Sequence, residues 1–187
     1  MKYLIVGLGN IGKEYEDTRH NIGFMVADQL VKNSNASFST LRYAAYSEFT
    51  LRGRKVHVIK PSTFMNLSGK AVSYWMKALK IPIQNVLVIV DDLAIPFGSL
   101  RIKPKGSNAG HNGLKSIEQL CGGSNYPRLR FGIGDNYPRG HQVNFVLSPF
   151  DSEETKELPE LIEHAVKMCE SFIHVGLELT MTQLNKK

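Results

Sequence analysis

The residues of this 187-residue chain best suited to chemistry are a histidine and an aspartate at expected boundaries of secondary structure. His20 follows a polar loop and precedes an apolar helical pattern, whereas Asp91 ends the most apolar strand pattern, residues 86–90. A carboxylate placed at the end of so buried a strand needs a polar partner. An imidazole bonded to a carboxylate is held in one tautomer and is stabilised when it takes up a proton. His20 and Asp91 are therefore the candidates for acid–base catalysis.

Further polar residues fall at loop positions beside the same elements: Asn10, Asn66, His111 and Asn112. No serine or cysteine stands in a nucleophile elbow, so a histidine base would most simply activate water. The asparagine amides could hold an amide or ester substrate and donate hydrogen bonds to a developing oxyanion. Hydrolysis of an ester or amide is the reaction that this set predicts.

A different chemistry is suggested by Gly7-Leu-Gly-Asn-Ile-Gly12, which follows a short apolar run and matches the G-x-G-x-x-G fingerprint of dinucleotide-binding proteins. That fingerprint needs a helix opening at its third glycine and an acidic residue at the end of a second strand about 20 residues further on. The residues after Gly12 show no apolar stripe for two turns, and Asp28, which has the spacing, lies inside a helical pattern. A nicotinamide-dependent oxidoreductase is the weaker alternative.

The elements that must position these residues alternate between strands and helices. Strands are predicted at residues 3–6, 86–90, 98–103 and 128–134, and residues 45–51 and 55–59 should form a hairpin. Helices are predicted over residues 21–30 and from near residues 69, 113 and 152. Weak alternation in the second hairpin arm predicts that His57 faces solvent. The pattern indicates one α/β domain over residues 1–187, with a mixed twisted sheet covered by helices on both faces.

The net charge of +6 is distributed unevenly along the chain. Residues 101–141 hold seven lysines and arginines against two acids, whereas residues 151–170 hold seven acids against two lysines. A basic region beside an acidic helix suggests that an anionic partner docks on one face, with nucleic acid as the first candidate. Solvated surface charge without a partner is the alternative.

The composition, with 42% hydrophobic residues, is that of a globular protein. No apolar run approaches the roughly 20 residues needed to span a bilayer, and the first residues lack a signal-peptide core. Cys121 and Cys169 form no C-x-x-C motif, and the six histidines include no pair at helical ligand spacing. These features predict a cytoplasmic protein without a metal or other cofactor and without a membrane partner.

Most of the candidate residues lie in several blocks of sequence. The blocks are Gly7-Leu-Gly-Asn-Ile-Gly12 followed by Tyr15 and Thr18-Arg-His-Asn21; Lys60-Pro-Ser-Thr-Phe-Met-Asn-Leu-Ser-Gly69; the strand ending at Asp91; Gly110-His-Asn-Gly-Leu-Lys115; and Arg128-Leu-Arg-Phe-Gly-Ile-Gly134. Together and in this order, the blocks resemble bacterial peptidyl-tRNA hydrolase, and the resemblance covers the chain from Met1 to about Phe150. Two departures stand out: Asp91-Asp-Leu-Ala94 replaces the family's usual Asp-Glu-Leu-Asp, and Gly106-Ser-Asn-Ala-Gly110 is less rich in glycine than is common.

The resemblance implies that a monomer cleaves the ester joining a peptide to the 3′ end of tRNA. It implies that His20 is the general base for water, that Asp91 stabilises its protonated form, and that Asn10 helps to distinguish N-blocked from free aminoacyl groups. An RNA-binding module of the same fold without activity is the alternative from another class. The implied substrate contacts are Tyr15, Phe64, Asn66 and Asn112, and His111, beside Asn112, is predicted as a further one. The implied clamp for the tRNA phosphates consists of Arg101, Lys103 and Arg130, and Lys105 adds positive charge nearby.

Overall fold

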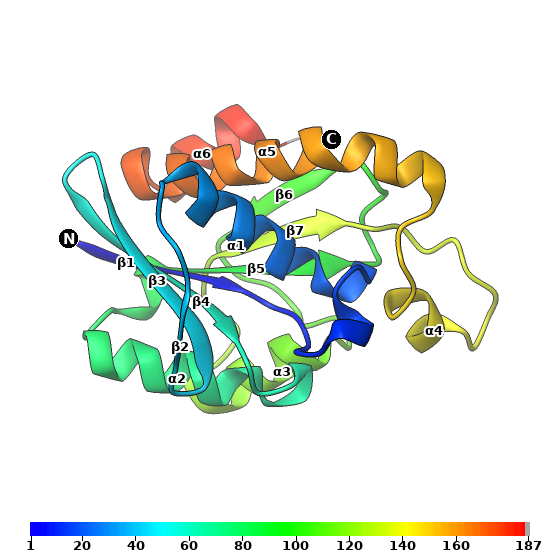
Figure 1. Ribbon diagram of the computed structural model, residues 1–187, viewed down its shortest axis with the longest axis horizontal. Helices are drawn as coiled ribbons and strands as arrows, with labels where there is room; N and C mark the ends of the chain where they lie inside the picture. The colour runs from blue at the N-terminus through cyan, green and yellow to red at the C-terminus, as the bar shows by residue number, and fades with distance from the viewer. Residues whose placement is uncertain (186–187) are drawn as a thin grey trace.

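A seven-stranded mixed sheet runs through the computed structural model, which describes residues 1–185, and helices cover both faces of the sheet (Figure 1). The strand order is β2-β3-β4-β1-β5-β7-β6. Strands β4, β1, β5 and β7 run parallel, whereas β2, β3 and β6 pair antiparallel with their neighbours. The predicted fold class is confirmed. The strands are β1 (Lys2–Gly7), β2 (Ser39–Leu41), β3 (Ala44–Leu51), β4 (Arg54–Pro61), β5 (Val86–Asp92), β6 (Leu100–Lys103) and β7 (Arg128–Gly132).

The apolar strands β1 and β5 lie at the centre of the sheet because both of their faces are covered by helices. All seven residues of β5 are buried, as are all residues of β1 after Lys2. One layer contains α1 (Ile22–Asn33), α5 (Ser152–Val175) and α6 (Leu177–Leu184), which pack against side chains such as Ile5 and Ile89. The other contains α2 (Ser68–Leu79) and α3 (Asn112–Cys121), which pack against Val6 and Val88. The remaining helices are α4 (Gln142–Val146) and the short 3-10 helices η1 (Lys13–Tyr15), η2 (Arg19–Asn21), η3 (Met65–Leu67) and η4 (Ile83–Asn85).

The glycine-rich loop after β1 allows α1 to approach the strand closely. A Cβ atom on Gly7 would lie 2.2 Å from the carbonyl oxygen of Gly23 in α1, and one on Gly9 would lie 2.8 Å from the ring of Phe24. The first helix of more than one turn begins at Ile22 rather than at Gly12, so no such helix opens at the third glycine, as the dinucleotide fingerprint requires. The glycines therefore serve helix–strand packing, and the context of a dinucleotide fingerprint is missing.

The predicted hairpin is confirmed as β3 and β4, but the predicted exposure of His57 is wrong. His57 is 4% exposed, and its Nδ1 lies 2.6 Å from the hydroxyl oxygen of Tyr46. Strand β4 lies between β1 and β3, and apolar residues cover both of its faces, so alternation along it carries little information. Strand β2 and helices α4 and α6 were not predicted. No helix within residues 1–185 is long and apolar enough to cross a membrane.

Candidate active site

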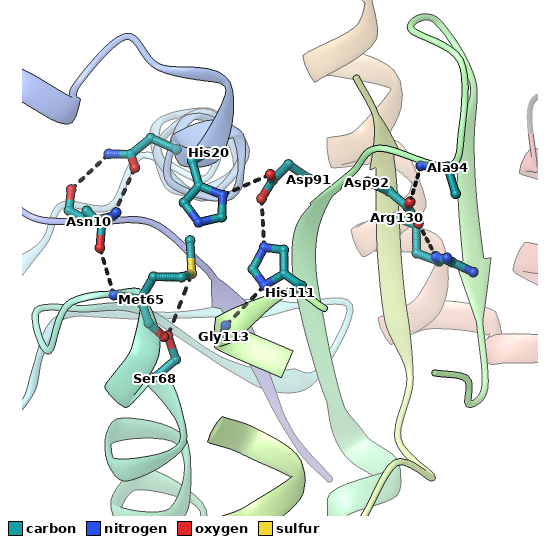
Figure 2. A network of polar contacts seen from close by, with 11 residues as sticks. Asn10, His20, Met65, Ser68, Asp91, Asp92, Ala94, His111, Gly113 and Arg130 are labelled. Carbon is teal, nitrogen blue, oxygen red and sulfur yellow. Dashed lines mark hydrogen bonds and ion pairs between the residues drawn. The ribbon is translucent and has the colours of Figure 1, made fainter. Parts of the chain in front are cut away.

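Asp91 lies between two histidines at the carboxyl end of β5 (Figure 2). Its Oδ2 atom is 2.9 Å from Nδ1 of His20, and its Oδ1 atom is 2.8 Å from Nε2 of His111. His20 is carried by η2 after the glycine-rich loop, and His111 is the N-cap residue of α3. The predicted pairing of His20 with Asp91 is therefore present, and His111, predicted as a substrate contact, is a second partner of the same carboxylate.

The hydrogen bonds determine which nitrogen of each imidazole carries a proton. The backbone N–H of Gly113 donates to Nδ1 of His111, with 3.1 Å between the nitrogens, so His111 must be protonated on Nε2 and donates from there to Asp91. An ionised carboxylate only accepts hydrogen bonds, so Nδ1 of His20 also carries its proton toward Asp91. Nε2 of neutral His20 is left with a free lone pair, which is the arrangement that a general base requires.

The electrostatics of this cluster favour an ionised Asp91 beside a His20 that readily takes up a proton. Burial opposes ionisation of Asp91, but the two imidazoles, His111 and then His20, hold the pKa of its carboxyl well below the usual range. Burial also opposes protonation of His20, yet the charge of Asp91 and its hydrogen bond raise the pKa of His20 above its ordinary value. The pair can therefore accept a proton from water and stabilise the resulting imidazolium.

Asn10 is held in one orientation beside His20 by three hydrogen bonds. Its Oδ1 atom accepts the N–H of Met65 at 2.7 Å, so its Nδ2 group is the end that remains available as a donor. Its main chain is paired in both directions with the side chain of Asn21, whose Oδ1 accepts the N–H of Asn10 and whose Nδ2 donates to the carbonyl oxygen, each at 2.9 Å. Asn21 was not predicted as a site residue, although it belongs to the Thr18-Arg-His-Asn21 block.

A cleft of about 540 Å³ opens over this cluster at the carboxyl ends of the parallel strands. This is where ligands bind in open α/β sheets. Helix α4 and the preceding segment contribute one wall through Tyr137, Gln142, Val143 and Val146. The predicted site residues that line the cleft are Asn10, His20, Asn66, Asp91, His111, Asn112 and Arg130.

The other predicted contacts lie outside the lining of the cleft. Tyr15 ends η1 and is half-buried, whereas Phe64 is 51% exposed and has a φ of 32°, a strained value for a residue other than glycine. Arg101 and Lys103 are half-buried on the same face of β6, as the predicted alternation requires, and Lys105 is exposed beyond them. The roles of these five residues as substrate or phosphate contacts stay predictions.

Arg130 differs from the other predicted clamp residues because it is paired with a carboxylate. Its Nε donates to Asp92, the second acid of the Asp91-Asp-Leu-Ala94 run, and the other oxygen of Asp92 accepts the N–H of Ala94 at 2.8 Å. Arg130 lies directly opposite Arg101 in the β6–β7 register, so Asp92 offsets part of a dense positive charge. The sequence did not reveal this pairing, although β5 and β7 had both been predicted.

His20, Asp91 and His111 are also a group within residues 1–185 that could hold a metal ion, since their ligand atoms lie within 4.8 Å of one another. Each carboxylate oxygen of Asp91 already accepts a hydrogen bond from one imidazole N–H. A metal ion bound by all three residues would have to displace both hydrogen bonds. The arrangement can perform proton transfer without a metal. The metal-free site remains a prediction.

The fold and the site together define a single-domain α/β protein with an imidazole–carboxylate centre in a cleft at the sheet edge. A family model described as Peptidyl-tRNA hydrolase matches residues 4–187. Peptidyl-tRNA hydrolase of Bacteroides fragilis is 57% identical over the full length of both chains, and that of Phocaeicola vulgatus is 56% identical over the same span. The crystal structure of peptidyl-tRNA hydrolase from Acinetobacter baumannii superposes with a TM-score of 0.92 at 32% identity, over 98% of this chain and 94% of that one. The chain belongs to the peptidyl-tRNA hydrolase family.

Proposed function

We propose that this protein hydrolyses the ester between the carboxyl group of a peptide, or of an N-blocked amino acid, and the 3′-terminal ribose of tRNA. The observation that carries the proposal is the hydrogen bond between Nδ1 of His20 and Asp91 at 2.9 Å, because it leaves Nε2 of His20 as a base in the cleft. Membership of the family supplies the substrate class. An RNA-binding module without activity would have no need for this proton-accepting pair.

The reaction begins when Nε2 of His20 takes a proton from a water molecule as the water oxygen attacks the ester carbonyl carbon. Asp91 stabilises the imidazolium that forms. The tetrahedral intermediate then collapses, the bond to the ribose oxygen breaks, and the proton on His20 passes to that oxygen. The products are a peptide with a free carboxylate and a tRNA with a free terminal hydroxyl.

The asparagines around the base are suited to hold the acyl part of the substrate. Nδ2 of Asn10 is a fixed donor because Met65 occupies its Oδ1 atom, and it can bind a carbonyl oxygen of the peptide. Asn66 and Asn112 are exposed on the cleft lining and can pair with the remaining amide and hydroxyl groups. An N-blocked aminoacyl group offers one more carbonyl than a free one, which gives this site a physical basis for discrimination.

We assign the tRNA acceptor end to the surface of β6 and β7 beside the cleft, which Arg130 of β7 lines. Arg101 and Lys103 lie on one face of β6, with Arg130 beside Arg101, and such a cluster attracts phosphates at any base sequence. Lys105 extends the positive charge toward the loop before α3. Tyr15 and the exposed Phe64 suit stacking on terminal bases or on the peptide.

We further infer that the protein acts as a monomer in the cytoplasm. The proposed catalytic residues all come from one chain, so a second copy is not needed to complete the site. Cys121 and Cys169 are free, and Cys169 is buried, which suits a reducing compartment.

The test is the release of tRNA from N-acetylated aminoacyl-tRNA by the wild type and by His20→Ala. We expect turnover by the wild type, much slower turnover of the unblocked aminoacyl-tRNA, and loss of activity in the variant with tRNA binding retained. A wild type that binds tRNA without releasing the acyl group would favour the binding-module alternative. An active His20→Ala variant would remove His20 from the mechanism.

A further inference from the structure

Arg19, the residue before His20, reaches across to the segment that carries α4. It is 7% exposed, and its Nη2 donates to Oε1 of Glu154 in α5 at 2.8 Å. Its Nη1 donates to the carbonyl oxygen of Phe145 at 3.3 Å and to the hydroxyl of Ser148. The guanidinium carbon also lies 4.1 Å from the centre of the Phe145 ring, within the range of a cation–π contact.

Apart from Arg19, helix α4 is held by Phe145 and Val146, which pack against the edge of the core, and by the ring of Tyr137, whose centre lies 5.0 Å from that of Phe145. All five of its residues are exposed or half-buried, and a helix of this length is not stable by itself. Its main packing partner is η2, so α4 lies beside the segment that follows β1 (Figure 1). The main chain contributes an N–H bond from Arg19 to the carbonyl of Ser148 at 3.0 Å and an isolated bridge between Thr18 and Pro149.

The same helix forms a wall of the cleft that contains the proposed base. Gln142, Val143 and Val146 line the cleft together with His20. A shift of α4 would therefore change the shape of the substrate site. The bond between His20 and Asp91 does not involve α4, because His20 lies in η2, which also packs against β5, and Asp91 lies in β5.

We propose that Arg19 is a positioning residue that fixes the α4 wall of the cleft for substrate binding. An arginine is needed because one planar group must meet a carboxylate, a hydroxyl and a carbonyl while stacking on an aromatic ring, which the single ammonium of a lysine cannot do. The proposal rests on the proposed hydrolase function only where activity is measured. The position of α4 can be measured without any substrate.

The first experiment compares Arg19→Lys with the wild type in the hydrolysis of N-acetylated aminoacyl-tRNA. We expect KM to rise about tenfold while kcat changes by less than about threefold, because the lost interaction concerns binding rather than the proton transfer. The acid limb of the pH profile should not move, since Asp91 still sets the protonation of His20. The control is Val166→Ala, which removes buried methyl groups from α5 and should lower the melting temperature with KM unchanged.

The second experiment is amide hydrogen exchange in the same variant without substrate. Exchange should accelerate in the peptide covering residues 142–149 and stay slow in the peptide covering β5. Slow exchange in β5 distinguishes loosening of α4 from unfolding of the whole domain.

Unchanged exchange at residues 142–149 would overturn the proposal, as would an unchanged KM in a folded variant. A displaced acid limb or a fall in kcat alone would show that Arg19 acts on His20 instead. If the wild type has no hydrolase activity but exchange at residues 142–149 is still faster in Arg19→Lys, the proposed function is contradicted. The role of Arg19 in holding α4 is then still supported.

Discussion

Replacing Asp91 by asparagine should inactivate the protein through the tautomer of His20. Asp91 accepts one hydrogen bond from each histidine, whereas an asparagine offers one accepting oxygen and one donating amide. His111 is fixed as a donor because its Nδ1 accepts from Gly113, so it will take the asparagine oxygen. The amide nitrogen then faces Nδ1 of His20 and places the proton of that ring on Nε2, where it can no longer accept one from water.

The magnitude follows from the two competing orientations of the asparagine. Turning the amide so that its oxygen faces His20 leaves the N–H of His111 facing another donor, and a buried donor without an acceptor costs about 1–3 kcal/mol. That penalty makes the productive orientation rarer by a factor of roughly 5 to 150. A tautomer error of this kind, combined with the lost charge on the carboxylate, lowers kcat by about 10⁴ in serine proteases. We expect a loss of similar order here.

A double variant, Asp91→Asn with His111→Ala, distinguishes competition of the two histidines for the asparagine oxygen from a simple loss of negative charge. Without His111 the asparagine oxygen is free to face His20, so single-turnover release of tRNA should recover by roughly 5- to 150-fold over Asp91→Asn alone. His111→Ala by itself serves as the control and should reduce the rate. A double variant no faster than Asp91→Asn would refute the reasoning about competition for the oxygen, and near-normal activity of Asp91→Asn would refute the role of Asp91.

Three further predictions concern pH, salt and packing. Neutral His20 is the active form and its pKa is raised, so kcat/KM should fall as the pH drops through a value above the ordinary one for histidine; an acid limb at or below that value would contradict the assignment. Lys103→Ala should weaken tRNA binding at low salt and reduce the slope of log K against log salt by about 1, whereas Lys32→Ala on α1 should leave the slope unchanged; titrations at several salt concentrations measure both. Gly7→Ala should lower the free energy of unfolding by at least about 1–3 kcal/mol in a denaturant titration, because its Cβ would lie 2.2 Å from the carbonyl oxygen of Gly23, and wild-type stability would show that the helix can move aside.

The sequence was informative where a residue's place follows from strand order. The apolar runs identified β1 and β5, and polar residues at the carboxyl ends of neighbouring parallel strands meet at one edge, so the approach of His20 to Asp91 could be predicted. Side-chain pairings between distant elements could not be predicted, because each cation in the sequence has several carboxylates as possible partners. The bond between Arg130 and Asp92 is one example. Helix α4 was missed because five exposed or half-buried residues produce no periodic apolar pattern.

The double hydrogen bond between Asn10 and Asn21 has a consequence for the entropy of catalysis. The side chain of Asn21 pairs with the main chain of Asn10 as a neighbouring strand would, and so closes the intervening loop into a ring. Closing such a loop costs conformational entropy once, when the chain folds. Asn10 and His20 then stand in fixed relation before the ester arrives, so the freedom of the loop is not lost again with each substrate molecule, and groups that are already ordered lower the barrier of every turnover.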